Sequence, residues 1–211
     1  MKKLNDYGLA HLVYFFLNFE GGELNLALEL NGWFILIVVI ICWGWRTYKV
    51  YVKGNYLAYQ EIITQLLFIY ILSIGYLTMQ PFHFQLPFTV REFSFDYHLF
   101  YNLRHMADGY FAYQLLYSVG NILLFVPLGI LLPSLYKKTN NFILVGLIGL
   151  MTSITIEMVQ ALFTISRLGT VDDLVFNTIG TLLGYVFFRC LKLFQKRIVY
   201  FYSIQKQSKN I

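Results

Sequence analysis

Five apolar runs, each close to the 20 or so residues that a helix needs to cross a bilayer, constrain the fold of this chain most strongly. They lie near residues 30–50, 59–80, 113–134, 141–164 and 173–194. Only 13% of the residues are charged and 58% are hydrophobic, whereas a soluble domain carries about 25% charged residues. The sequence therefore predicts an all-α, polytopic membrane helix bundle that forms a single domain over residues 1–211.

The first 29 residues contain an additional apolar segment, Leu4–Phe19, that is short for a membrane span. Lys2 and Lys3 precede this segment, and an acidic connection follows it. This charge distribution favours a short sixth helix over an interfacial or re-entrant piece, with the N-terminus on the cytoplasmic side.

Basic residues occur mainly in connections that alternate with the apolar runs. These residues are Arg46, Lys49 and Lys53, then Lys137 and Lys138, and finally Lys192, Lys196, Arg197, Lys206 and Lys209. Because short cytoplasmic loops are enriched in Lys and Arg, all three groups are predicted to be cytoplasmic, including a basic tail at 195–211. The aromatic segment 81–112 is then outside, as a lid or a packing segment in the headgroup layer. The basic residues form no groove-reading stripe, so we expect no nucleic-acid partner.

Two of the apolar runs carry polar residues at the spacing of one helix face. In one run Glu157 and Gln160 follow Ser153 at i+4 and i+7, and in the other Asn177 follows Asp173 at i+4. A carboxylate inside a membrane helix is costly and by default marks a bundle interior or a water-filled cavity.

Helical rise places polar groups from three runs at a similar depth near the outer surface, below the short loop at 165–172. The predicted binding pocket comprises Asn121, Glu157, Gln160, Arg167, Asp172, Asp173 and Asn177. The alternatives are structural: the amides could only bond a neighbouring helix, and one aspartate could cap the last helix. For close helix packing we expect Gly180, Gly184 and Gly129, with a kink at Pro127.

The sequence contains no phosphate-binding Gly-rich loop, no H-E-x-x-H and no Cys-x-x-Cys. We therefore expect no cofactor and no metal, although Glu157, Asp172 and Asp173 offer the oxygen ligands that a hard divalent cation prefers. Catalysis stays an open alternative, with Glu157 as the candidate acid or base.

Taken in order, these motifs resemble the VanZ-like family of small bacterial membrane proteins over residues 70–190. The matching blocks are Asn121-Ile-Leu-Leu-Phe125-Val-Pro127-Leu-Gly129-Ile-Leu-Leu-Pro133, Glu157-x-x-Gln160, Arg167, and Asp172-Asp173-Leu-Val-Phe-Asn177-Thr-x-Gly180-x-x-x-Gly184. The resemblance implies a multi-pass protein of the bacterial plasma membrane with a cytoplasmic C-terminus. The family's namesake confers low-level resistance to teicoplanin, but the family has no agreed reaction.

Two functions from different classes fit these residues. In the first, an outward-facing pocket binds a membrane lipid headgroup or a lipid-linked cell-wall precursor, with Arg167 meeting phosphate. In the second, the protein is a membrane-embedded enzyme that acts on such a lipid, with Glu157 transferring a proton.

Overall fold

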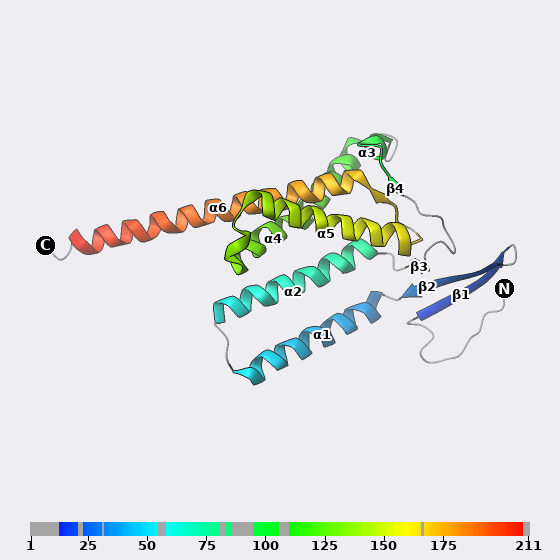
Figure 1. Ribbon diagram of the computed structural model, residues 1–211, viewed down its shortest axis with the longest axis horizontal. Helices are drawn as coiled ribbons and strands as arrows, with labels where there is room; N and C mark the ends of the chain where they lie inside the picture. Colours follow the sequence, from blue (N-terminus) through cyan, green and yellow to red (C-terminus); the bar gives the residue numbers. More distant parts are fainter. Residues whose placement is uncertain are drawn as a thin grey trace.

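A bundle of long helices dominates the computed structural model of the protein (Figure 1). The structure describes residues 13–20, 23–30, 32–54, 58–80, 83–85, 95–105, 110–165 and 167–208. The long helices are α1 (Gly32–Lys53), α2 (Ala58–Met79), α4 (Phe111–Leu135), α5 (Phe142–Phe163) and α6 (Val171–Ser208). The shorter elements are β1 (Val13–Glu20), β2 (Glu23–Leu30), β3 (His83–Gln85), β4 (Phe95–Asp96), α3 (Tyr101–His105), η2 (Lys137–Thr139) and β5 (Gly169–Thr170).

The predicted all-α membrane fold is confirmed. Segments of α2, α4, α5 and α6 are long and apolar enough to cross a membrane: Tyr59–Met79, Phe111–Leu135, Phe142–Phe163 and Val171–Tyr200. The first expected span is the 22-residue helix α1, whose crossing of the membrane stays a prediction. Many large apolar side chains on the outside of the bundle are exposed, as a hydrocarbon-facing surface requires.

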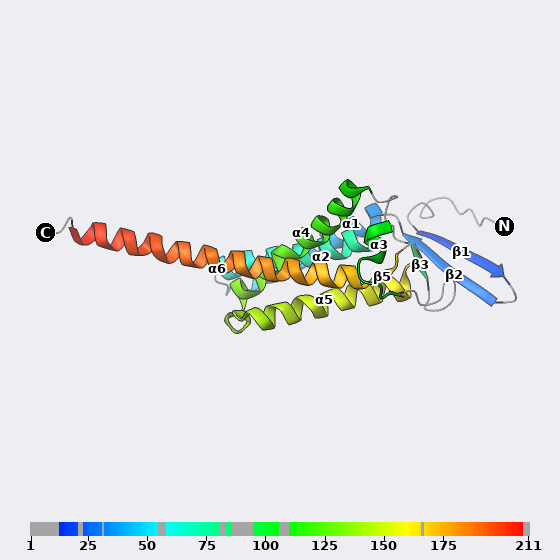
Figure 2. The same ribbon diagram turned by 90° about the horizontal axis from the view of Figure 1, so that it is seen from above.

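The long helices run side by side and alternate in direction along the chain (Figures 1 and 2). Helix α6 packs against α4 and α5, α2 packs against α4, and α1 packs against α2. The central apolar cluster contains Phe125 and Leu128 of α4 together with Ile74 and Ile156. The hydroxyl of Tyr70 donates to the carbonyl of Leu124 over 2.9 Å, which joins α2 to α4.

Glycines bring the backbones of α4 and α6 into close contact. A Cβ added to Gly180 would meet the carbonyl of Ile122, and one added to Gly184 would meet the carbonyl of Val126. On the facing helix, a Cβ on Gly129 would collide with the carbonyl of Thr181. Small residues permit this approach where packing, rather than the hydrophobic effect, joins helices in lipid. Helix α4 continues through Pro127 and Pro133, so neither proline ends it.

The N-terminal region differs from the predicted short helix. Residues 13–20 form strand β1, which pairs antiparallel with β2 from Val13↔Leu30 to Glu20↔Glu23; residues 4–12 of the predicted helix lie outside the described residues. Leucines alternate with other residues from position 24 to 30, and a Gly-Gly dipeptide separates the two strands in sequence. This pattern is typical of a hairpin, so local strand chemistry outweighs the charge argument for a helix.

The connection between α2 and α4 is tied to the beginning of α6. Strand β4 pairs in parallel with β5, which directly precedes α6, and the N–H of Ile165 donates to the carbonyl of His83 over 3.0 Å. The β strands lie at one end of the bundle, and α6 projects from the other end toward the C-terminus (Figure 1). The first turn of α6 therefore lies at the end where the predicted outer segments gather.

Candidate functional site

The N-terminus of α6 is organised by a threonine that the sequence analysis did not single out. The Oγ1 of Thr170 accepts the backbone N–H of Asp173 over 3.2 Å, which is the bond of a helix N-cap. Asp172 and Asp173 both lie in the first turn, where a carboxylate is favoured by the helix dipole. The sequence analysis allowed for an aspartate as the cap of this helix. In the structure the capping oxygen comes from Thr170 instead. The T-x-x-D spacing was the available signal.

Asp173 links α6 to α4 at the centre of the polar cluster. Its Oδ1 accepts the hydroxyl of Tyr117 over 2.5 Å, and the same oxygen accepts the side-chain amide of Asn121. All three side chains are half-buried, so they are partly accessible. Tyr117 was not predicted, although it lies one turn from Asn121 on the same face of α4.

Glu157 holds the β5–α6 junction from inside the bundle. Only 2% of its surface is exposed, and its Oε2 accepts the backbone N–H of Thr170 over 3.0 Å. Gly169 lies so close that a Cβ there would come within 2.8 Å of the carbonyl oxygen of Glu157. A buried carboxylate needs such a partner, because desolvation otherwise disfavours it strongly.

Asp172 holds the connection between α2 and α4 at the turn before α3. It is 3% exposed, and its Oδ1 accepts the backbone N–H of Phe100 over 2.6 Å. Phe100 has a φ of 60°, a left-handed conformation that bulky residues rarely adopt. The ring of Phe100 lies 6.1 Å from that of Phe176 on α6. The bond from Asp172 and this ring contact hold a strained turn over the start of α6.

The two buried amides join helices, as the structural alternative proposed. The Nε2 of Gln160 donates to the carbonyl of Thr78 on α2 over 2.7 Å, and the Nδ2 of Asn177 donates to the Oγ of Ser153 over 2.9 Å. Among the described residues, the amide oxygens of Gln160 and Asn177 have no hydrogen-bond partner. Each amide therefore uses its donor side to bridge helices and retains an acceptor.

Arg167 lies on the exposed side of the loop between α5 and α6. Its Nε donates to the carbonyl of Gln80 at the end of α2 over 2.8 Å. The bond joins this loop to the C-terminal end of α2, while the carboxylate of Glu157 is bonded to Thr170. The structure thus gives Arg167 a positioning contact with the residue that follows α2.

The three carboxylates serve three different parts of the structure: Glu157 bonds β5, Asp172 bonds the turn before α3, and Asp173 bonds α4. Within the described part of the chain, no three His, Cys, Asp or Glu residues are grouped so that they could hold a metal ion. The divalent-cation alternative therefore gains no support from these residues.

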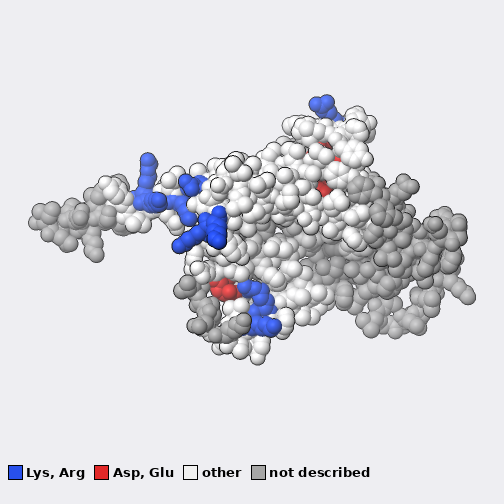
Figure 3. All heavy atoms as spheres, viewed as in Figure 1, with Lys and Arg blue, Asp and Glu red and all other residues white. Residues whose placement is uncertain are grey.

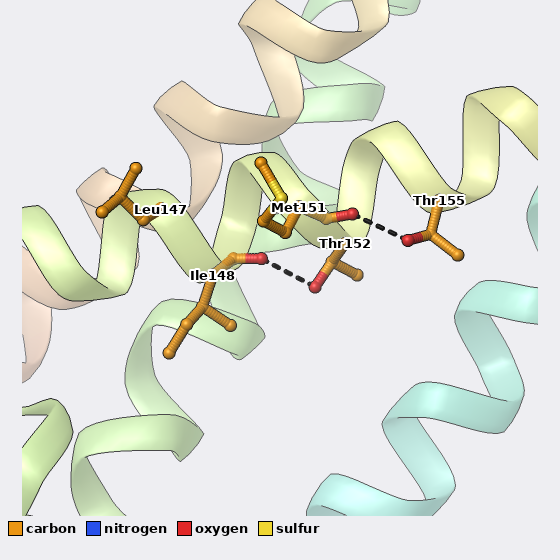
Figure 4. A pocket seen from close by; sticks show the side chains of 5 residues that line it. All are labelled: Leu147, Ile148, Met151, Thr152 and Thr155. Carbon is orange, nitrogen blue, oxygen red and sulfur yellow. Dashed lines mark hydrogen bonds between the residues drawn. The ribbon is translucent and has the colours of Figure 1, made fainter.

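A separate groove of about 310 Å³ lies along the middle of α5 (Figure 4). It is lined by Leu147, Ile148, Met151, Thr152 and Thr155. The two threonine hydroxyls donate to the carbonyls one turn earlier in α5, at 2.8 and 2.9 Å. The groove therefore offers an apolar, hydrocarbon-like surface, distinct from the polar cluster.

Apolar helices of membrane-spanning length that enclose a polar cluster at one end define this chain as a polytopic membrane protein. It belongs to the VanZ/LLP1 family, whose model matches residues 67–194. The matched region contains all the residues of the polar cluster described above. Comparisons with curated proteins and with solved structures found no match.

Proposed function

We propose that this VanZ-family protein binds the polar headgroup of a membrane lipid or of a lipid-linked cell-envelope precursor. The binding site is the outward end of the bundle, where Asp173, Tyr117 and Asn121 meet below Arg167. The protein resides in the bacterial plasma membrane with its C-terminus in the cytoplasm. Where the bound lipid is a cell-wall precursor, its capture alters susceptibility to teicoplanin-type antibiotics.

The observation that carries the proposal is the half-buried position of Asp173 and its two donors within an otherwise apolar bundle. Burying a carboxylate is costly unless it is paired and hydrogen-bonded, and this holds for Asp173 although it lies in the first turn of α6. Well-packed apolar residues often stabilise a core at least as well as buried ions. Glu157 and Asp172 add two further buried carboxylates at this end. The number of buried carboxylates here therefore exceeds what helix packing alone requires.

The chemistry of these side chains suits a headgroup with both phosphate and hydrogen-bonding groups. The guanidinium of Arg167, on the exposed side of the loop, can pair with phosphate oxygens. Tyr117, Asn121 and Asp173 offer a hydroxyl, an amide and a carboxylate for hydroxyl or amide groups of the ligand. The Lys and Arg distribution predicts that this end faces outward, where cell-wall precursors are used.

The burial of Glu157 supports binding over the enzymatic alternative. A general acid or base has to come within hydrogen-bond reach of the reacting proton. Glu157 is almost fully enclosed, and its carboxylate accepts the N–H of Thr170. We therefore assign Glu157 to building the site, by fixing the start of α6, and not to proton transfer.

The test is to identify the lipids that co-purify with the full chain, by mass spectrometry, for wild type and for Asp173→Asn. The control is Thr155→Val, which removes an exposed hydroxyl bonded to its own helix. We expect one lipid class to be enriched over the bulk membrane in wild type and control and to be lost in Asp173→Asn. An identical lipid profile in all three proteins would contradict the proposal.

A further inference from the structure

The end of the bundle opposite the polar cluster carries exposed cations on two adjacent elements. Lys137 and Lys138 lie on η2, and Arg189 and Lys192 lie on α6 where that helix leaves the bundle. Figure 3 shows Lys and Arg side chains gathered at this end of the molecule. We call the four residues the η2–α6 junction.

A packed base holds two of these cations, Arg189 and Lys192, in place. The Oδ1 of Asn140 accepts the hydroxyl of Tyr185 and the Nη1 of Arg189, both over 3.3 Å. The backbone N–H of Asn140 donates to the carbonyl of Lys137 over 3.2 Å, so the same residue connects η2 with α6. The Nζ of Lys192 lies 4.6 Å from the centre of the Phe188 ring, which is a cation–π contact.

The aromatic residues beneath these contacts are buried. Tyr185 and Phe188 form an apolar cluster with Val145 of α5, and the rings of Phe142 and Tyr185 meet edge to face at 6.0 Å. Arg189 and Lys192 therefore project from a packed surface, which lowers the entropic cost of ordering them around a ligand.

The junction lacks acidic neighbours in the sequence. Residues 109–156 and 174–211 contain no Asp or Glu, so the cations of η2 and α6 have no acidic counter-charge from α4, from most of α5 or from the rest of α6. The acidic residue in the neighbouring helix pair is Glu61, which is bonded to Arg46 over 2.8 Å. An external anion is thus the natural counter-charge for the junction.

The depth of the junction identifies that anion. It lies where α4 ends at Leu135 and α5 begins at Phe142, beside the exposed aromatic ring of Tyr136. Aromatic and basic residues at the ends of membrane helices lie at the level of lipid headgroups. We propose that the η2–α6 junction is a binding site for the phosphate headgroup of an anionic phospholipid in the cytoplasmic leaflet. This site is separate from the outward-facing one and rests on the proposed function only for the cytoplasmic side of the C-terminus.

The experiment titrates the purified full chain in detergent with phosphatidylglycerol or phosphatidylcholine and measures bound lipid by native mass spectrometry. The variant is Arg189→Gln with Lys192→Gln; the control is Lys49→Gln, which removes a cation held over the Trp45 ring on α1. We expect phosphatidylglycerol to bind more tightly than phosphatidylcholine. Its affinity should fall about fivefold for each charge removed at the junction, because a basic residue near an anionic membrane surface contributes on the order of 1 kcal/mol.

Three results would overturn the inference. They are equal binding of the two lipids, wild-type phosphatidylglycerol binding by the double variant, or an equal loss in Lys49→Gln, which would indicate a diffuse basic surface. Lys137→Gln with Lys138→Gln provides a second test, since these exposed side chains can change without disturbing the packed base. Inorganic phosphate at the same concentrations should not displace the lipid; displacement would be a fourth contrary result, since it would indicate a site for free phosphate instead.

Discussion

Replacing Gly184 by alanine should separate the two helices that hold the polar cluster. An added Cβ would meet the carbonyl of Val126 and lie 3.1 Å from the Cα of Gly129, and both are backbone atoms that cannot rotate away. Overpacking of this kind costs about 1–3 kcal/mol. Gly120→Ala on α4 is the matched control, because an added Cβ there meets nothing within 4 Å. Alanine is favoured over glycine inside a helix by about 0.5–1 kcal/mol, so the control should be slightly more stable than wild type.

Both substitutions gain the same helix propensity, so the difference between the two variants is the overpacking cost alone, about 1–3 kcal/mol. The assay is reversible unfolding of the purified chain in mixed micelles with increasing denaturing detergent, followed by circular dichroism. Gly184→Ala should unfold at a lower detergent fraction than wild type, and Gly120→Ala at an equal or higher one. Equal free energies of unfolding for the two variants would refute the close α4–α6 approach.

Three further predictions address the cluster and the topology. Thr170→Val removes the capping oxygen of α6 and should lower the free energy of unfolding by about 1 kcal/mol in the same assay. A double-mutant cycle of Tyr117→Phe and Asp173→Asn should give a coupling energy of about 0.6–1.7 kcal/mol, because the two side chains share a hydrogen bond within the bundle. A coupling energy of zero would contradict this hydrogen bond. In a cysteine-free background, an impermeant thiol reagent added outside should label Arg167→Cys and should not label Lys138→Cys. Labelling of Lys138→Cys alone would show that the predicted topology is inverted.

The membrane fold was predictable because length and apolarity alone define a span. The run expected near 113–134 is α4, Phe111–Leu135, and the run expected near 141–164 is α5, Phe142–Phe163. The N-terminal hairpin was not predicted, because the prediction of a short helix rested on the flanking charges; the alternation of leucines from 24 to 30 is the signal that indicates a strand. A short apolar segment is ambiguous between helix and strand, and its pairing partner decides.

The polar residues of the cluster were identifiable from their cost in an apolar helix, but their partners were not. Asn121 and Asp173 were expected near one another, and the structure joins them by a hydrogen bond. The sequence analysis did not identify three hydroxyl partners, Thr170, Ser153 and Tyr117. A hydroxyl group costs little free energy in a membrane helix, so its presence does not indicate a polar site as a carboxylate does. Depth and helix face follow from sequence, whereas the rotation of one helix against another depends on packing.

The most direct test of a lipid-binding cluster is photo-crosslinking in native membranes. A benzoylphenylalanine replaces Tyr113, an exposed aromatic residue one turn outward from Tyr117 on α4, and in a control protein it replaces the exposed Leu147 in the α5 groove. The adducts are then identified by mass spectrometry. We predict one dominant lipid class at position 113, abolished by Asp173→Asn, and the bulk lipid mixture at position 147. The same mixture at both positions would contradict a headgroup site at the start of α6.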